Sequence, residues 1–72
     1  MFILELQYDG RDFIDEFEFA NDTVIEKVIL PREIKHIKKF AFFMCSNLKE
    51  IVLPNSLETI GENAFSKCYN LK

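Results

Sequence analysis

The side chains that could do chemistry in this chain are few, and their spacing does not assemble a catalytic or metal site. The sequence holds one histidine and two cysteines, at positions 36, 45 and 68. They lack the C-x₂-C and H-x₃-H spacings of zinc sites. A nucleophile needs a neighbouring base, and the serines at positions 46, 56 and 66 have no second histidine with which to form a triad. We therefore expect no enzymatic activity, no metal and no cofactor.

The remaining candidate motifs are weak. Glu58 and Glu62 lie four residues apart, but nothing near them indicates the burial that acid–base catalysis needs. The only glycines are Gly10 and Gly61, so there is no glycine-rich phosphate loop. The basic stretch 35–39 could contact phosphate, but it lacks interleaved exposed aromatic residues, and a solvated surface is the simpler interpretation. We expect no nucleic-acid binding, although Lys35, Lys38 and Lys39 leave binding to an acidic polymer as a distant alternative.

A 23-residue repeat is the dominant pattern in the sequence. When residues 24–49 are laid over residues 47–72, nine positions are identical and four more keep apolar residues. The identical pairs are Leu30/Leu53, Pro31/Pro54, Ile37/Ile60, Ala41/Ala64, Phe42/Phe65, Cys45/Cys68, Asn47/Asn70, Leu48/Leu71 and Lys49/Lys72. A repeat of this length is typical of solenoids, because each unit can bury its apolar face only against a copy of itself.

Each repeat predicts a strand followed by a helical segment. Residues 25–30 and 48–53 are rich in β-branched side chains and end before a proline, which favours strand. The apolar residues that follow, at 34, 37, 41, 42 and 45 and again 23 positions later, have the spacing of a loosely helical face. We therefore expect an α/β-type solenoid in which equal positions stack, for example Val28 on Ile51 and Phe42 on Phe65.

The string L-P-x-x-[IL]-x-x-I-x-x-x-A-F-x-x-C-x-N-L-K occurs in both copies and resembles the BspA-type leucine-rich repeat. Residues 53–68 fit that pattern closely, whereas the first copy departs from it at Lys38 and at Phe43-Met44. The resemblance covers residues 24–72. It implies a parallel sheet on a concave side, irregular or helical turns on a convex side, and a kinship with cell-surface and adhesive proteins.

Residues 1–23 do not follow the repeat when they are shifted by 23 positions, because Glu5 would fall on Val28 and Gln7 on Leu30. Apolar residues alternate with polar ones on both sides of Asp9-Gly10, which predicts an antiparallel β-hairpin. We expect this hairpin to cap a stack of two repeats. The predicted organisation is a hairpin cap at 1–23, repeat 1 at 24–46 and repeat 2 at 47–72, with the C-terminal end of the stack open.

Charge and cysteine usage add further limits. Residues 1–23 carry a net charge of −6 and residues 24–72 a net charge of +3, which the simplest interpretation assigns to a solvated surface. The two cysteines occupy equal positions and are expected to be free thiols in the core, although stacking would bring them near disulfide range. The chain has no signal-peptide pattern and no apolar run long enough to cross a membrane. These features suggest a cytoplasmic location by default, or the cell surface by resemblance if the chain belongs to a longer protein.

The sequence therefore predicts a non-catalytic leucine-rich-repeat module that binds another protein through its concave sheet face. The expected contact residues are Glu18, Lys27, Ile29, Glu50 and Val52. The alternative is a structural or self-assembling unit of a larger array, whose open edge would hold Leu48, Ile51, Leu53 and Leu71. The identity of the partner and the oligomeric state do not follow from the sequence. Phe43 and Met44 are equally compatible with exposure and with packing under the predicted hairpin.

Overall fold

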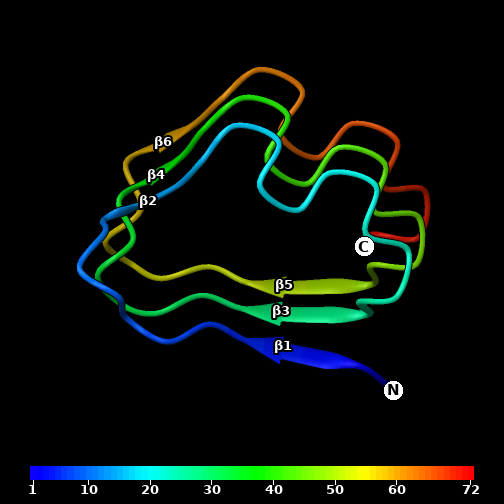
Figure 1. Cartoon of the computed structure of the whole chain (residues 1–72), viewed down its shortest axis with the longest axis horizontal. Helices are drawn as coiled ribbons and strands as arrows, with labels where there is room; N and C mark the ends of the chain where they lie inside the picture. Colours follow the sequence, from blue (N-terminus) through cyan, green and yellow to red (C-terminus); the bar gives the residue numbers. More distant parts are fainter.

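The computed structural model describes all 72 residues and shows three successive coils that lie over one another (Figure 1). Each coil contributes one strand to each of two parallel, three-stranded sheets. The first sheet has the order β1 (Ile3–Glu5), β3 (Lys27–Ile29), β5 (Glu50–Val52), and the second has the order β2 (Phe13–Ile14), β4 (His36–Ile37), β6 (Thr59–Ile60). We name the coils coil 1 (residues 1–24), coil 2 (25–47) and coil 3 (48–70). No element is a helix that could cross a membrane.

The predicted N-terminal hairpin is wrong. β1 pairs in parallel with β3, and β2 pairs in parallel with β4, so the first 23 residues form a coil of the same stack. The alternation of apolar residues around Asp9-Gly10 was a true strand signal, but each strand finds its partner in coil 2 rather than in the neighbouring strand of its own coil. The fold therefore has three coils where the sequence predicted two repeats and a cap.

One extra residue in coil 1 explains why the sequence pattern concealed this coil. Leu4 pairs with Val28, an offset of 24, whereas Ile14 pairs with Ile37, an offset of 23. The additional residue lies between Leu6 and Asp12, in the corner where Gly10 adopts a φ of 97°. Glycine populates this left-handed conformation at little cost, so the longer corner is accommodated without disturbing either sheet.

The predicted helical segments are also wrong, since the segments that follow the second sheet are series of tight turns. In coil 2, the amides of Ala41, Phe43 and Cys45 each donate to the carbonyl three residues earlier. The alternate amides, at Phe40, Phe42 and Met44, donate instead to carbonyls of coil 3. A helix would use every amide internally, so these segments exchange helical hydrogen bonds for bonds to the next coil.

Residues with left-handed φ angles keep these turns from becoming helical. They recur four residues apart within each coil and 23 residues apart between coils, at Phe17, Asn21, Phe40, Met44, Asn63 and Lys67. An L-residue in this conformation interrupts a right-handed helix. The apolar residues in this part of the sequence do share one buried side, but their spacing arises from successive tight turns and not from a helix.

The core is a column of equivalent side chains between the two sheets and the turns. Phe42 is fully buried and lies between the rings of Phe19 and Phe65, with centroid distances of 5.3 Å on both sides. The other buried residues of coil 2 are Ile25, Val28, Leu30, Ile34, Ile37, Ala41 and Cys45. Phe65 stacks on Phe42 as predicted, but it is only half-buried because it has a ring on one side alone.

Coil 3 lies close against the backbone of coil 2 at Gly61. A Cβ atom added at this position would lie 2.4 Å from the backbone nitrogen of Lys39. That distance is far below a normal van der Waals contact, so a side chain here would force the two coils apart.

The aromatic column yields the first prediction. We expect Phe42→Ala to destabilise the protein by about 3–5 kcal/mol, because a large ring is removed from between two others, which would abolish cooperative unfolding in so small a domain. Phe65→Ala should lower the melting temperature less, since this ring is half-buried. Thermal unfolding followed by circular dichroism measures both effects. Equal losses in the two variants would contradict the central position of Phe42.

Candidate functional site

The outer face of the β1–β3–β5 sheet carries an ordered set of solvent-facing side chains. One row across the strands consists of Ile3, Lys27 and Glu50, and the next consists of Glu5, Ile29 and Val52. Four of the five predicted contact residues, Lys27, Ile29, Glu50 and Val52, therefore share this face. Ile3 and Glu5 also lie on this face, and they were not predicted because the segment of β1 was expected to form a hairpin.

Each row on this face combines charged and apolar side chains. The ammonium group of Lys27 lies 3.7 Å from the carboxylate of Glu50, so the first row is internally neutralised. In the second row Ile29 lies beside Val52, which is 40% exposed. The face thus presents a small apolar strip beside an ion pair, which suits contact with another protein better than it suits chemistry.

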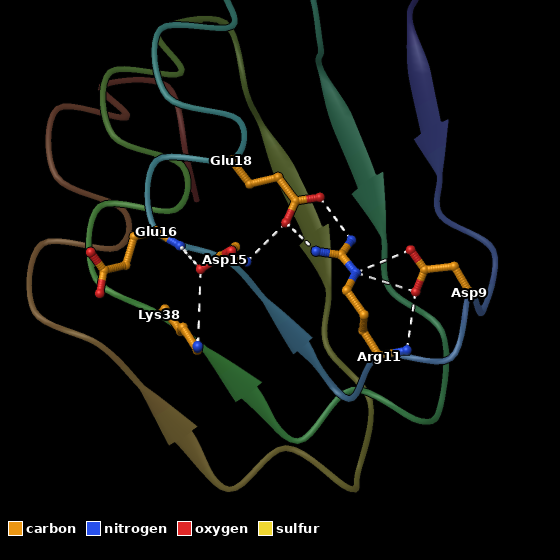
Figure 2. A network of polar contacts seen from close by, with 6 residues as sticks. All are labelled: Asp9, Arg11, Asp15, Glu16, Glu18 and Lys38. Carbon is orange, nitrogen blue, oxygen red and sulfur yellow. Dashed lines mark hydrogen bonds and ion pairs between the residues drawn. The ribbon is translucent and has the colours of Figure 1, made fainter.

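Glu18, the fifth predicted contact, does not lie on this face. It belongs to the turns after β2, where both of its carboxylate oxygens accept hydrogen bonds from Arg11 at 2.8 and 2.9 Å (Figure 2). Glu18 had been predicted to face water from the N-terminal hairpin. With the hairpin replaced by a coil, Glu18 points toward the middle of the N-terminal end of the stack.

The Arg11–Glu18 pair is the centre of a polar network, which we call the polar lid. Arg11 also donates through Nε to the carboxylate of Asp9 at 3.1 Å, and the amide of Asp15 donates to Glu18 at 2.8 Å. Lys38 of coil 2 reaches the Asp15 carboxylate at 4.0 Å (Figure 2). These bonds join the corner after β1 to the turns after β2 across the first coil.

The positions of the lid residues in the repeat explain its location. With the offset of 23, Arg11 is equivalent to the core residue Ile34, and Glu18 is equivalent to the core residue Ala41. Two inward positions of coil 1 are therefore charged, and their side chains pair with each other over the core instead of entering it. A polar outer surface is what a terminal repeat needs in water.

The lid changes the titration of its carboxyl groups. The pKa of Glu18 is lowered, mainly by the hydrogen bonds from Arg11, and the pKa of Asp9 is lowered by the backbone amide of Arg11. The same contacts raise the pKa of Arg11. The lid is therefore most stable with its carboxylates ionised.

The outermost coils differ at one pair of equivalent positions on the second sheet. Ile14, beneath the polar lid, is only 1% exposed, whereas its counterpart Ile60 in coil 3 is 51% exposed. Leu53 is 39% exposed at the same end, and Ile51, Phe65 and Leu71 are partly buried. We call this apolar surface of coil 3 the open end.

Leu48, which the sequence placed on this edge, is fully buried and belongs to the core. Leu71 is its counterpart one period later, and the amide of Lys72 donates to the carbonyl of Lys49 as the amide of Lys49 does to Glu26. Residues 71 and 72 thus follow the path of the next turn and cover Leu48, which removes it from the open end.

The open end also carries unpaired backbone donors. The amide of Leu30 donates to coil 3, but the equivalent amide of Leu53 has no acceptor. The same holds for the amides of Asn63, Phe65 and Lys67, whose counterparts in coil 2 all donate to coil 3. An edge with free donors and apolar side chains is a ready surface for pairing with another chain.

The cysteines are free thiols with equivalent contacts. The thiol of Cys45 donates to the carbonyl of Phe19 at 3.1 Å, and that of Cys68 donates to the carbonyl of Phe42 at 3.0 Å. Burial raises the pKa of both thiols, to about 12 for Cys45. Each cysteine thus binds its coil to the previous one.

The basic stretch 35–39 is distributed over several contacts. Lys38 lies 4.2 Å from the centre of the Phe13 ring in addition to its approach to Asp15. The ring of His36 makes a 2.7 Å contact with the hydroxyl of Thr59 through Nδ1. These side chains are used between coils and do not converge on a common point.

Phe43 and Met44, which the sequence left open, lie on the turn side of coil 2. Phe43 is partly buried and makes an edge-to-face contact with Phe40, whose ring stacks on Phe17 at 5.0 Å. Met44 is 38% exposed. Phe43 therefore packs against the aromatic residues of the turns, while Met44 faces solvent.

Comparison with known proteins agrees with this architecture. The family model described as a BspA type leucine rich repeat region (6 copies) matches residues 12–72. The match begins in coil 1, at the point where the offset between coils becomes 23. The chain belongs to the BspA-type leucine-rich repeat family. Neither the curated proteins nor the solved structures include a match to it.

The polar lid predicts an acid-dependent loss of stability. Because the folded-state pKa of Glu18 is below its ordinary value of 4.5, its contribution is complete above that value and is lost as the pH falls toward the folded-state pKa. We expect the melting temperature to fall on acidification below about pH 5, and Glu18→Gln to show a shallower fall. Melting curves between pH 7 and 3 test this. Parallel pH profiles for the two proteins would show that the lid does not contribute.

The buried thiols predict slow chemical modification. At pH 8 Cys45 is almost wholly protonated and is shielded from solvent, so a thiol reagent should react with neither cysteine in the native protein. Addition of denaturant should release two reactive thiols per chain. Rapid reaction under native conditions would contradict the packing of this column.

Proposed function

We propose that this protein is a non-catalytic leucine-rich-repeat module that binds a protein partner through the outer face of the β1–β3–β5 sheet. The observation that carries this proposal is the pair of solvent-facing rows across the three strands, in which an apolar strip adjoins an ion pair. Side chains held on stacked strands are fixed relative to one another, so a partner meets a surface with little conformational entropy left to lose. Membership in a repeat family whose sheets commonly serve as binding surfaces supports this use.

The proposed contacts are Ile3, Glu5, Lys27, Ile29, Glu50 and Val52. Glu18 is left out of this set because its carboxylate is held by Arg11. The fitting partner is a protein surface with an apolar side chain to lie on Ile29 and Val52, and with polar groups at the rim. An ion pair that is exposed on one side adds specificity rather than affinity.

A second candidate is structural, and the open end favours it. The exposed apolar side chains and unpaired amides of coil 3 are satisfied when another repeat unit covers them, either from a longer array or from a separate chain. In that role the polar lid closes one end of an assembly whose other end remains available.

The sheet-face proposal is tested by one substitution and a matched control. We expect Ile29→Lys to weaken binding of the partner at least tenfold, because it places a charge in the centre of the apolar strip. Val24→Lys introduces the same side chain at a position that is 61% exposed and outside both rows, so it should leave binding unchanged. Partners captured from the source cell by the wild-type protein are identified by mass spectrometry, and their dissociation constants are then compared across the three proteins.

The control decides between surfaces. A partner that tolerates Ile29→Lys as well as it tolerates Val24→Lys would contradict binding through the sheet face. Circular dichroism confirms that both variants retain the fold.

A further inference from the structure

Coil 1 has a longer corner between its two strands than coil 2 has. Residues 6–11 of coil 1 take the place of residues 30–34 in coil 2, at the end of the molecule where the two sheets are connected (Figure 1). The backbone hydrogen bonds from this corner to coil 2 are at Leu6 and at Asp12, and none joins residues 7–11 to coil 2. The middle of the corner thus lacks the main-chain bonds that hold the strands together.

The corresponding corners of coils 2 and 3 are joined by a side chain. The hydroxyl of Ser56 donates to the carbonyl oxygens of Arg32 and Ile34 in coil 2. Glu33 has the position of Ser56 in coil 2, and an ionised carboxylate cannot donate a hydrogen bond to coil 1. The contact that closes the corner between coils 2 and 3 is therefore missing between coils 1 and 2.

A hollow lies at this corner, and we call it the corner hollow. It contains about 290 Å³ of space, the solvent at its mouth included. Pro31 and Ile34 of coil 2 line it together with six residues of coil 1, among them Leu6 and Ile14. Because both coils supply its walls, the hollow is a feature of the contact between them.

The walls of the corner hollow combine buried apolar side chains with exposed polar ones. Ile14 and Ile34 are only 1% and 3% exposed, and Leu6 packs against the core. Tyr8, which also lines the hollow, is 55% exposed, and Gln7 beside it is exposed as well. Apolar walls with a few polar groups are the usual composition of a site that binds an apolar group.

Arg11 also lines the hollow, but its charge is already matched within the polar lid. Its two terminal nitrogens donate to Glu18 at 2.8 and 2.9 Å, and its Nε donates to Asp9 at 3.1 Å (Figure 2). An anionic ligand would have to compete with two carboxylates for this guanidinium group. The corner hollow is therefore unsuited to phosphate or to a carboxylate.

The surface around the hollow is acidic. The side chain of Asp9 is 57% exposed although it pairs with Arg11, and Asp12 is exposed and forms no ion pair. Residues 1–23 as a whole carry a net charge of −6. Complementary charge favours encounter with a cationic partner and disfavours an anionic one.

We propose that the corner hollow binds an aliphatic side chain of a partner protein, in a segment that places lysine or arginine next to that side chain. The aliphatic group contacts Leu6, Pro31 and Ile34, and the cationic groups lie toward Asp9 and Asp12. The space is near the lower limit of ligand pockets, about 300 Å³, so it suits one side chain rather than a cofactor. The proposal goes beyond the sheet-face function, because none of the six proposed contacts on that face lines the hollow.

Short peptides test this proposal on the ¹⁵N-labelled 72-residue chain. We expect acetyl-Lys-Leu-Lys-amide to shift the amide resonances of residues 6–11 and of Ile34, with a dissociation constant in the millimolar range. Acetyl-Lys-Gly-Lys-amide lacks the aliphatic group and acetyl-Glu-Leu-Glu-amide reverses the charge, so each should bind about tenfold more weakly. Isoamylamine, which carries an aliphatic group and a cation without a peptide backbone, should also bind more weakly.

Two changes in the protein locate the site. Gln7→Lys places a cation on an exposed wall residue and should weaken binding of acetyl-Lys-Leu-Lys-amide about tenfold. Val24→Lys introduces the same side chain outside the hollow, at a position that is 61% exposed, and should leave binding unchanged. Deletion of Gly10 gives coil 1 a corner of the same length as that of coil 2, and it should abolish the shifts while the protein remains folded by circular dichroism.

The contrary results are distinct. Absence of shifts at the corner, or equal binding of the Lys-Gly-Lys peptide, would overturn the proposal. Equal binding of isoamylamine would assign the hollow to a small amine and overturn a protein ligand. Shifts confined to Lys27, Ile29 and Val52 would place the peptide on the sheet face and overturn the corner site. The sheet-face function is judged separately by Ile29→Lys, since Ile29 does not line the hollow.

Discussion

Backbone hydrogen bonds between consecutive coils are the constraint on which the rest of this structure depends. They hold each coil about 4.8 Å from the next, so every inward side chain lies directly on its counterpart. Burial is therefore a property of neighbouring pairs of coils, and not of any coil alone. Coil 2, with a neighbour on each side, provides most of the core, and Phe42 is fully enclosed because both flanking rings are present.

Because burial needs a neighbouring coil, a coil with a neighbour on one side only leaves its repeat core positions uncovered on the other side. Such a coil is where polar residues are expected to replace core residues. Coil 1 departs by replacing two core residues with Arg11 and Glu18, which form a bidentate pair above Ile14. Coil 3 does not depart in this way, and it keeps Leu57 and Ala64 at the equivalent positions. Coil 1 thus carries a charged pair at positions where coils 2 and 3 keep core residues.

The repeat in the sequence correctly predicted the stacking of identical or similar residues at equal positions of coils 2 and 3. The parallel pairing of Val28 with Ile51, the stacking of Phe65 on Phe42 and the free cysteines all followed from the repeat. Coil 1 escaped prediction for two physical reasons. An extra residue before Asp12 shifts β1 out of register, and polar groups at core positions conceal the repeat.

The errors at the candidate site had local causes. Glu18 was placed on the sheet face because alternation in strand parity was extended through a segment that in fact turns. The repeat also gives the turns an apolar spacing close to that of a helix, and only the left-handed φ angles, for example at Phe40, distinguish the two. The sequence did contain one signal of the lid. Arg11 and Glu18 have opposite charges and lie 23 residues before the core residues Ile34 and Ala41.

Coil 2 makes equivalent backbone hydrogen bonds with coil 1 and with coil 3, and this limits how the protein can gain residues. Residues 25–47 both donate hydrogen bonds to and accept them from each neighbouring coil, and the pattern toward coil 1 recurs between coils 2 and 3. A tandem duplication of this segment would therefore insert a coil with compatible surfaces above and below. The protein can therefore be lengthened by insertions of whole 23-residue repeats. An insertion of any other length within a strand would shift the strands that follow it out of register. The single extra residue near Gly10 survives because it lies in a corner outside both ladders.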